Sequence, residues 1–187
     1  MVDLSVHDPR IRQDIRYATT DNFMKERLYP VARCLVLLPV AESLKSVQTE
    51  LEAQGLGLKI YDAYRPLVVQ KKMWARVPVE GYVANPAKGS NHNRGAAVDL
   101  TLVDADGREL PMPSAYDEFT ERAHRDYAGG SEEERHNRWI LEEVMERNGF
   151  KGLRSEWWHF DYRDAKSYPV LDVPLEAVPA EAPGSDR

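Results

Sequence analysis

The stretch Ser90-Asn91-His92-Asn93-Arg94-Gly95-Ala96-Ala97-Val98-Asp99 is the most informative part of this chain. It places His92 and Asp99 seven residues apart with Gly95 between them, so a turn entering a strand can bring both side chains to one point. Imidazole and carboxylate groups are both good zinc ligands, although each residue taken alone also suits a polar surface position. The stretch raises the hypothesis of a metal site that needs a further ligand.

A second group, Glu156-Trp157-Trp158-His159, supplies that ligand near the C-terminus. His159 also fits a hydrogen-bonded core histidine, but the Glu156 carboxylate is costly to bury among aromatic residues unless it is paired or functional. Three protein ligands leave zinc one open position for water, and a free carboxylate beside that water suits peptide-bond hydrolysis. Three residues apart on an ideal strand, Glu156 and His159 face opposite sides, so a bulge or an approach at different depths is required.

The other histidines are weaker candidates for metal ligation. His7 lies close to the N-terminus, while His124 and His136 lie in strongly charged segments that are typical of solvated surface. We therefore keep His92, Asp99 and His159 as the candidate ligand set.

A possible oxyanion partner lies in the segment Tyr61-Asp62-Ala63-Tyr64-Arg65-Pro66. The Arg65 guanidinium can face a developing negative charge while Asp62 holds it through a charge-assisted hydrogen bond. The alternative is a structural ion pair with no role in chemistry.

Composition limits the class of protein. The 187 residues are 42% hydrophobic and 30% charged, which suits one globular domain with a substantial core. The formal net charge of −6 provides no basic footprint, so we expect a small-molecule partner, no nucleic acid and no membrane. The single Cys34 lies in an apolar run and is expected to be buried. No secretory signal is evident at the N-terminus, which predicts a cytoplasmic protein.

Periodicity predicts an α+β fold. Three strands are expected over residues 56–64, 96–103 and 156–162. Three helices are expected over residues 41–54, from Pro66 through Trp74, and from a capping box of Ser131 and Glu134 to Asn148-Gly149. We therefore expect one α+β domain, with helices packed against a largely antiparallel sheet, over residues 1–172. Residues 173–187 are rich in proline, alanine and charge, which predicts a disordered tail.

Taken together, the motifs resemble a known family, the zinc D-alanyl-D-alanine dipeptidases of the VanX and DdpX group. The resemblance covers most of residues 10–170 and is carried by five segments: Arg16-Tyr17-Ala18-Thr19-x-Asp21-Asn22, residues 61–66, Ser90-x-His92-x-x-Gly95-x-Ala97-x-Asp99, Phe119-x-Glu121-Arg122-x-His124, and residues 156–159. One departure is a short connection between Trp74 and Gly81-Tyr82-Val83, where the VanX branch has a longer insertion. This departure makes the chain look closer to DdpX.

The resemblance implies a hedgehog and D,D-peptidase-like zinc fold and a role for each matching residue. It assigns one Zn²⁺ per chain to His92, Asp99 and His159, general acid/base catalysis to Glu156, and transition-state stabilisation to Arg65 with Asp62 in support. It also places three further residues around the dipeptide: Tyr17, Ser90 and Asp117.

The function that the resemblance implies is hydrolysis of free D-Ala-D-Ala to D-alanine through a zinc-bound water. The wider superfamily leaves two alternatives open. One is a peptidoglycan D,D-carboxypeptidase or L-Ala-D-Glu-type endopeptidase, and the other is a non-catalytic, zinc-stabilised binding module. A homo-oligomer is also left open, as is the purpose of the reaction: nutrient use, cell-wall turnover or glycopeptide resistance.

Overall fold

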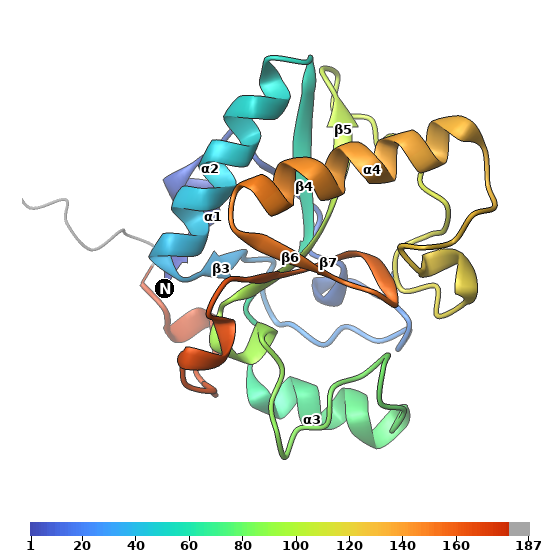
Figure 1. Ribbon diagram of the computed structural model, residues 1–187. Helices are drawn as coiled ribbons and strands as arrows, with labels where there is room; N and C mark the ends of the chain where they lie inside the picture. The colour runs from blue at the N-terminus through green and yellow to red at the C-terminus, as the bar shows by residue number, and fades with distance from the viewer. Residues whose placement is uncertain (180–187) are drawn as a thin grey trace, which may run out of the picture.

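A five-stranded mixed sheet organises the fold, with strand order β2-β4-β5-β7-β6 (Figure 1). The computed structural model describes residues 1–179. The sheet consists of β2 (Arg12–Gln13), β4 (Leu56–Asp62), β5 (Ala97–Asp104), β6 (Phe150–Leu153) and β7 (Glu156–Tyr162). Only the short β2 runs parallel to its neighbour, and the other three pairings are antiparallel. A separate antiparallel pair joins β1 (Val2–Asp3) to β3 (Leu35–Val36). The predicted α+β domain with a largely antiparallel sheet is confirmed.

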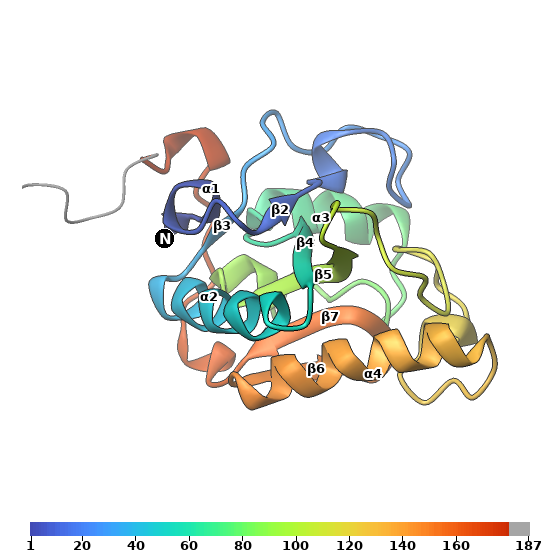
Figure 2. The same cartoon turned by 90° about the horizontal axis from the view of Figure 1, so that it is seen from above.

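Two long helices cover one face of the sheet. These helices, α2 (Leu38–Glu52) and α4 (Glu132–Arg147), contact each other and the central strands. Figure 2 shows both on the same side of the sheet, with α3 (Leu67–Arg76) on the other. A single turn, α1 (Leu4–His7), follows β1, and short 3₁₀ turns lie at Arg16–Ala18, His92–Arg94, Glu121–Ala123, Ala165–Ser167 and Leu175–Ala177. The apolar faces of α2 and α4 bury the core and leave the opposite face of β5 and β7 for other side chains.

Local sequence explains where the helices begin. The Ser131 hydroxyl accepts a hydrogen bond from the Glu134 amide, and the Glu134 carboxylate accepts one from the Ser131 amide, so the predicted capping box is confirmed. Helix α2 begins at Leu38 rather than Ala41, because Pro39 in the first turn lacks only an amide hydrogen that the helix does not use there. Pro66 lies just before α3 rather than inside it.

The start of the predicted disordered tail is wrong. Residues 173–179 pack on the domain, where Leu175 is only 1% exposed. Arg33 Nη1 donates to the carbonyls of Leu175 and Val178, at 2.8 and 2.6 Å, and Tyr64 Oη hydrogen-bonds to both the amide and the carbonyl of Val173. Distant polar partners offset the weak local propensity of this segment. Residues 180–187 of the predicted tail lie outside the described residues.

Within the described part of the chain, no helix combines the length and the apolar character that crossing a membrane requires.

Candidate metal and catalytic site

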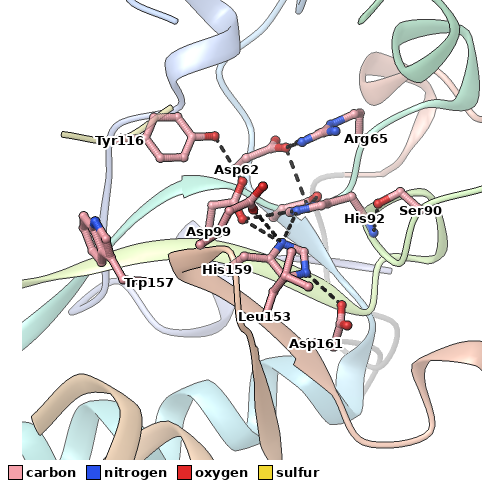
Figure 3. Close-up of polar contacts among 12 residues, drawn as sticks. Asp62, Arg65, Ser90, His92, Asp99, Tyr116, Leu153, Trp157, His159 and Asp161 are labelled. Carbon is pink, nitrogen blue, oxygen red and sulfur yellow. Dashed lines mark hydrogen bonds and ion pairs between the residues drawn. The ribbon is translucent and has the colours of Figure 1, made fainter. Parts of the chain in front are cut away.

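Strands β5 and β7 place the candidate ligands side by side. Asp99 of β5 is paired directly with His159 of β7, and His92 lies in the 3₁₀ turn that enters β5. Gly95 ends that turn with φ of +65°, a left-handed conformation that glycine adopts without steric cost. The three side chains lie on the face of the sheet opposite α2 and α4, as Figure 3 shows. The structure therefore brings together the two motifs that are 60 residues apart in sequence.

The spacing of the ligand atoms fits a zinc ion. His92 Nε2 lies 3.1 Å from His159 Nδ1 and 3.3 Å from Asp99 Oδ1, while His159 Nδ1 lies 3.0 Å from that same oxygen. Ligands about 2.0–2.2 Å from zinc at tetrahedral angles are separated from each other by about 3.3–3.6 Å, so two of these distances need to lengthen by a few tenths of an ångström when the ion binds. The donor set of two imidazoles and one carboxylate and its spacing both suit zinc with an open fourth position.

Hydrogen bonds fix which nitrogen of each ring faces the other ligands. His92 Nδ1 lies 2.7 Å from the Ala63 carbonyl and His159 Nε2 lies 2.9 Å from Asp161 Oδ1, so each of these nitrogens carries the proton that its acceptor needs. His92 Nε2 and His159 Nδ1 then face the Asp99 carboxylate, and each can give a lone pair to a metal ion. These three ligand atoms lie within 3.3 Å of one another, so positive charge is needed between them: a proton on one ring when no metal is bound, or a metal ion.

The charges around the site also favour a cation. The buried carboxylates of Asp62, Asp99 and Glu156 lie here beside one buried guanidinium, that of Arg65. Burial by itself lowers the pKa of His159. Hydrogen bonds to Asp161 and Asp99 outweigh this effect and raise the pKa to about 10. This position therefore stabilises positive charge strongly.

A bulge in β7 resolves the orientation of Glu156 and His159. Gly152 of β6 pairs with Phe160, but the next residue, Leu153, pairs with Glu156, so residues 157–159 have no partner on β6. We call these three residues the β7 bulge. It confirms the expectation that an ideal strand would not suffice, and it places Glu156 Oε2 4.0 Å from His159 Nδ1.

Glu156 is only 7% exposed. Burial raises its pKa to about 8; the neighbouring His159 opposes the shift, and the carboxylates of Asp99 and Asp117 add to it. A carboxyl group with a pKa in this range can both take and give a proton near neutral pH.

The guanidinium of Arg65 is held rigidly beside the ligands. Arg65 Nε and Nη2 donate to Asp62 Oδ2 at 3.1 and 2.7 Å, and Nη1 donates to Gln70 Oε1 at 2.8 Å. Asp62 is fully buried and also accepts a 2.7 Å hydrogen bond from Tyr29 Oη. A register shift between Ile60 and Asp62 puts Asp62 opposite Asp99, so the pair belongs to the site.

Tyr17 and Asp117 form a polar contact at the other side of the site. Tyr17 Oη donates to Asp117 Oδ1 at 3.2 Å, and the Phe23 amide donates to Asp117 Oδ2 at the same distance. Burial and the charge of Asp99 raise the pKa of Asp117 to about 7, even though these hydrogen bonds lower it. The backbone of Asp117 is left-handed, with φ of +60°.

Ser90 lies just before the turn that carries His92, and its Oγ accepts a hydrogen bond from the His92 amide at 3.2 Å. One cavity of about 550 Å³ connects Ser90 with the rest of the site. Its lining contains every candidate residue except Asp62, which supports Arg65 from behind: Tyr17, Arg65, Ser90, His92, Asp99, Asp117, Glu156 and His159.

Sequence reasoning missed four residues that hold the site together. Tyr116 Oη donates to Asp99 Oδ2 at 3.0 Å and leaves Oδ1 facing the histidines, Asp161 holds His159, and Tyr29 and Gln70 complete the surroundings of Asp62 and Arg65. Asp161 could have been found, because it lies two residues after His159 on the same strand and therefore on the same face. The other three carry no local signal.

Comparisons with known proteins identify the family. A family model described as D-ala-D-ala dipeptidase (Peptidase_M15) matches residues 1–177. A D-alanyl-D-alanine dipeptidase of Escherichia coli (strain K12) is 40% identical over 171 residues, which cover 91% of this chain and 89% of the relative. A D-alanyl-D-alanine dipeptidase of Enterococcus faecium is 37% identical over 192 residues, covering 89% of this chain and 93% of the relative.

Two solved structures are also similar. One is a VanY D,D-pentapeptidase variant in complex with Zn(II), with a TM-score of 0.44 and 18% identity over 70% of this chain and 74% of that one. The other is the LdcB LD-carboxypeptidase, with a TM-score of 0.45 and 20% identity over 71% of this chain and 61% of that one. On the family model and the sequence relatives, which span most of its length, this chain belongs to the D-alanyl-D-alanine dipeptidase family of zinc metallopeptidases.

Proposed function

We propose that this enzyme hydrolyses the free dipeptide D-Ala-D-Ala to D-alanine at the cavity that contains His92, Asp99 and His159. The observation that carries the proposal is the convergence of the three ligand atoms of His92, Asp99 and His159 within 3.3 Å of one another, with Glu156 beside them. The names of the relatives and of the family model support the choice of dipeptide.

We assign one zinc ion per chain to His92 Nε2, Asp99 Oδ1 and His159 Nδ1. When bound, the ion supplies a Lewis acid that acidifies a coordinated water and polarises the scissile carbonyl. The hydrogen bonds from His92 to Ala63, from His159 to Asp161 and from Tyr116 to Asp99 keep the three ligand atoms directed inward.

In this proposal, Glu156 moves the proton. Its carboxylate accepts a proton from the attacking water and returns that proton to the leaving amine, which keeps both steps within one buried group. The pKa of about 8 that burial gives Glu156 is close to the pH at which such a group is efficient.

Arg65 stabilises the oxyanion that forms from the scissile carbonyl. Two of its nitrogens are engaged with Asp62 and a third with Gln70, so the charged group needs no reorganisation when the negative charge develops. This preorganisation distinguishes Arg65 from a flexible surface arginine.

A free dipeptide is a zwitterion, so the cavity must hold an ammonium group as well as a carboxylate. Asp117 and Tyr17 offer a carboxylate and a hydroxyl on one side and suit the ammonium group. Ser90 lies on the turn beside His92 and suits the dipeptide carboxylate. These contacts favour a short substrate with a free N-terminus.

The experiment is a substrate panel: D,D-, L,D- and L,L-dipeptides with acyl-blocked D-Ala-D-Ala, assayed for amino-acid release with and without a zinc chelator. The proposal expects chelator-sensitive cleavage of the free D,D form alone. Cleavage of the acyl-blocked form at a comparable rate would instead indicate a carboxypeptidase or endopeptidase. No cleavage of any member by zinc-loaded protein would indicate a binding module. The cytoplasmic location and the homo-oligomer stay predictions.

A further inference from the structure

The β7 bulge leaves two carbonyl groups without a strand partner. The Tyr162 amide donates to the carbonyl of Ala96, the residue just before β5, so by the alternation of an antiparallel strand the backbone groups of His159 and Trp157 face β6. A continuous register would place Leu153 opposite His159, but Leu153 pairs with Glu156 instead. The carbonyls of Trp157 and His159 therefore need another donor, since buried carbonyls without one are costly.

One guanidinium takes the place of the missing strand. Arg125 Nη2 donates to the carbonyls of Trp157 and His159 at 3.0 and 2.7 Å, and Nε donates to the Leu153 carbonyl at 2.9 Å. The Arg125 amide also donates to the Arg154 carbonyl at 2.9 Å, in the turn between β6 and β7. Arg125 thus hydrogen-bonds to β7 at the bulge, to the end of β6 and to the turn that joins them.

The surroundings of Arg125 hold it in this position. Its side chain is only 8% exposed, its Cζ lies 4.2 Å from the centre of the Phe160 ring, and Nη1 lies 3.7 Å from a Glu142 carboxylate oxygen on α4. Burial lowers the pKa of Arg125 to about 10, so it still carries its charge at neutral pH. The charge strengthens all three hydrogen bonds to the carbonyls.

A glycine makes room for the guanidinium. A Cβ atom added at Gly152 would lie 2.2 Å from both Cζ and Nε of Arg125. Any other residue at position 152 would displace the guanidinium, which is the far end of a flexible side chain. The position of the guanidinium can therefore be disturbed in two ways, by a change of Arg125 itself or by a change of Gly152.

We propose that Arg125 is a positioning residue that holds the β7 bulge, so that Glu156 and His159, three residues apart, face one ion. The guanidinium hydrogen-bonds to the backbone carbonyls of Trp157 and His159, so its effect on the Glu156 and His159 side chains passes through the backbone of the bulge. The inference rests on the proposed roles of Glu156 and His159, and its test measures metal binding as well as turnover.

The test compares Arg125→Lys and Gly152→Ala with wild type, and uses Arg154→Lys as a matched control. Arg154 lies in the turn between β6 and β7, where its carbonyl accepts a hydrogen bond from the Arg125 amide, but its side chain is 84% exposed and pairs with the surface Asp126. Zinc affinity is measured by chelator competition, and kcat and KM are measured on D-Ala-D-Ala. We expect both test variants to lose zinc affinity about ten- to a hundredfold, the range found when outer partners of metal ligands are removed. The value of kcat should fall with little change in KM, because Tyr17 and Asp117 lie elsewhere.

Wild-type zinc affinity and kcat in folded Arg125→Lys and folded Gly152→Ala would overturn the proposal. If Arg125→Lys fails to fold, Gly152→Ala decides the matter, since it only displaces the end of the arginine side chain. Failure of both to fold would also overturn it, because Arg125 would then serve general stability. A wild-type protein that binds zinc but does not cleave D-Ala-D-Ala would remove the proposed function, while the comparison of zinc affinities would still judge Arg125.

Discussion

Replacing Asp161 should weaken zinc binding, although this residue is not a ligand. Its Oδ1 accepts a 2.9 Å hydrogen bond from His159 Nε2, which fixes the ring so that Nδ1 faces Asp99 and His92. Loss of such an outer partner costs about ten- to a hundredfold in metal affinity, or about 1.4–2.7 kcal/mol. The side chain of Asp161 is 32% exposed, so solvent partly screens its charge. Asp161→Asn keeps an acceptor and should lose about tenfold, whereas Asp161→Leu should approach a hundredfold.

The assay is competition for zinc against a chromophoric chelator, with Asp126→Asn as a matched control that removes an exposed carboxylate outside the cavity. We expect the order of affinity to be wild type and control, then Asp161→Asn, then Asp161→Leu. Equal affinities for all four proteins would refute the reasoning that Asp161 fixes the His159 ring. A loss in Asp126→Asn equal to that in Asp161→Asn would refute it too, because the effect would then be general to surface charge.

Three further predictions concern individual side chains. Glu156→Gln should retain zinc but slow turnover by about 10²–10⁴-fold, the usual contribution of a general acid/base, and undiminished turnover by the zinc-loaded variant would remove Glu156 from that role. Asp117→Asn should lower kcat/KM for the free dipeptide by about ten- to 150-fold, equivalent to the about 1.5–3 kcal/mol of a hydrogen bond to a charged group, and an unchanged kcat/KM would show that the ammonium binds elsewhere. Tyr64→Phe loses both hydrogen bonds to Val173 and should lower the free energy of unfolding by about 1–3 kcal/mol in urea titrations; an unchanged midpoint would show that segment 173–179 adds no stability.

Much of the fold could be predicted because its signals are local. The capping box at Ser131 and Glu134 depends on residues three positions apart, and the strand from Glu156 to Tyr162 is marked by its aromatic residues. Composition predicts a tail at residues 173–179 because it describes only a segment's own residues. The partners that hold the segment, Arg33 and Tyr64, are more than 100 positions away in sequence.

In the candidate site, too, residues within motifs could be predicted, whereas contacts between distant segments could not. His92, Asp99, His159, Glu156 and Arg65 could be selected because their motifs are specific as a set. How Glu156 and His159 face one ion could not be worked out, because it depends on a register shift between β6 and β7. Arg125, which donates to the carbonyls of that bulge, lies more than 30 positions before them in sequence. It belongs to none of the motifs from which the site was predicted.

The central claim is that one zinc ion per chain drives hydrolysis of a D,D-dipeptide. Titrating zinc into metal-stripped protein while measuring D-alanine release from free D-Ala-D-Ala tests this claim directly. We predict that activity is absent at first, rises in proportion to added zinc and reaches its limit at one equivalent per chain, and that His92→Ala gains none over the same range. Full activity in the stripped protein, or an equal response in His92→Ala, would contradict the account.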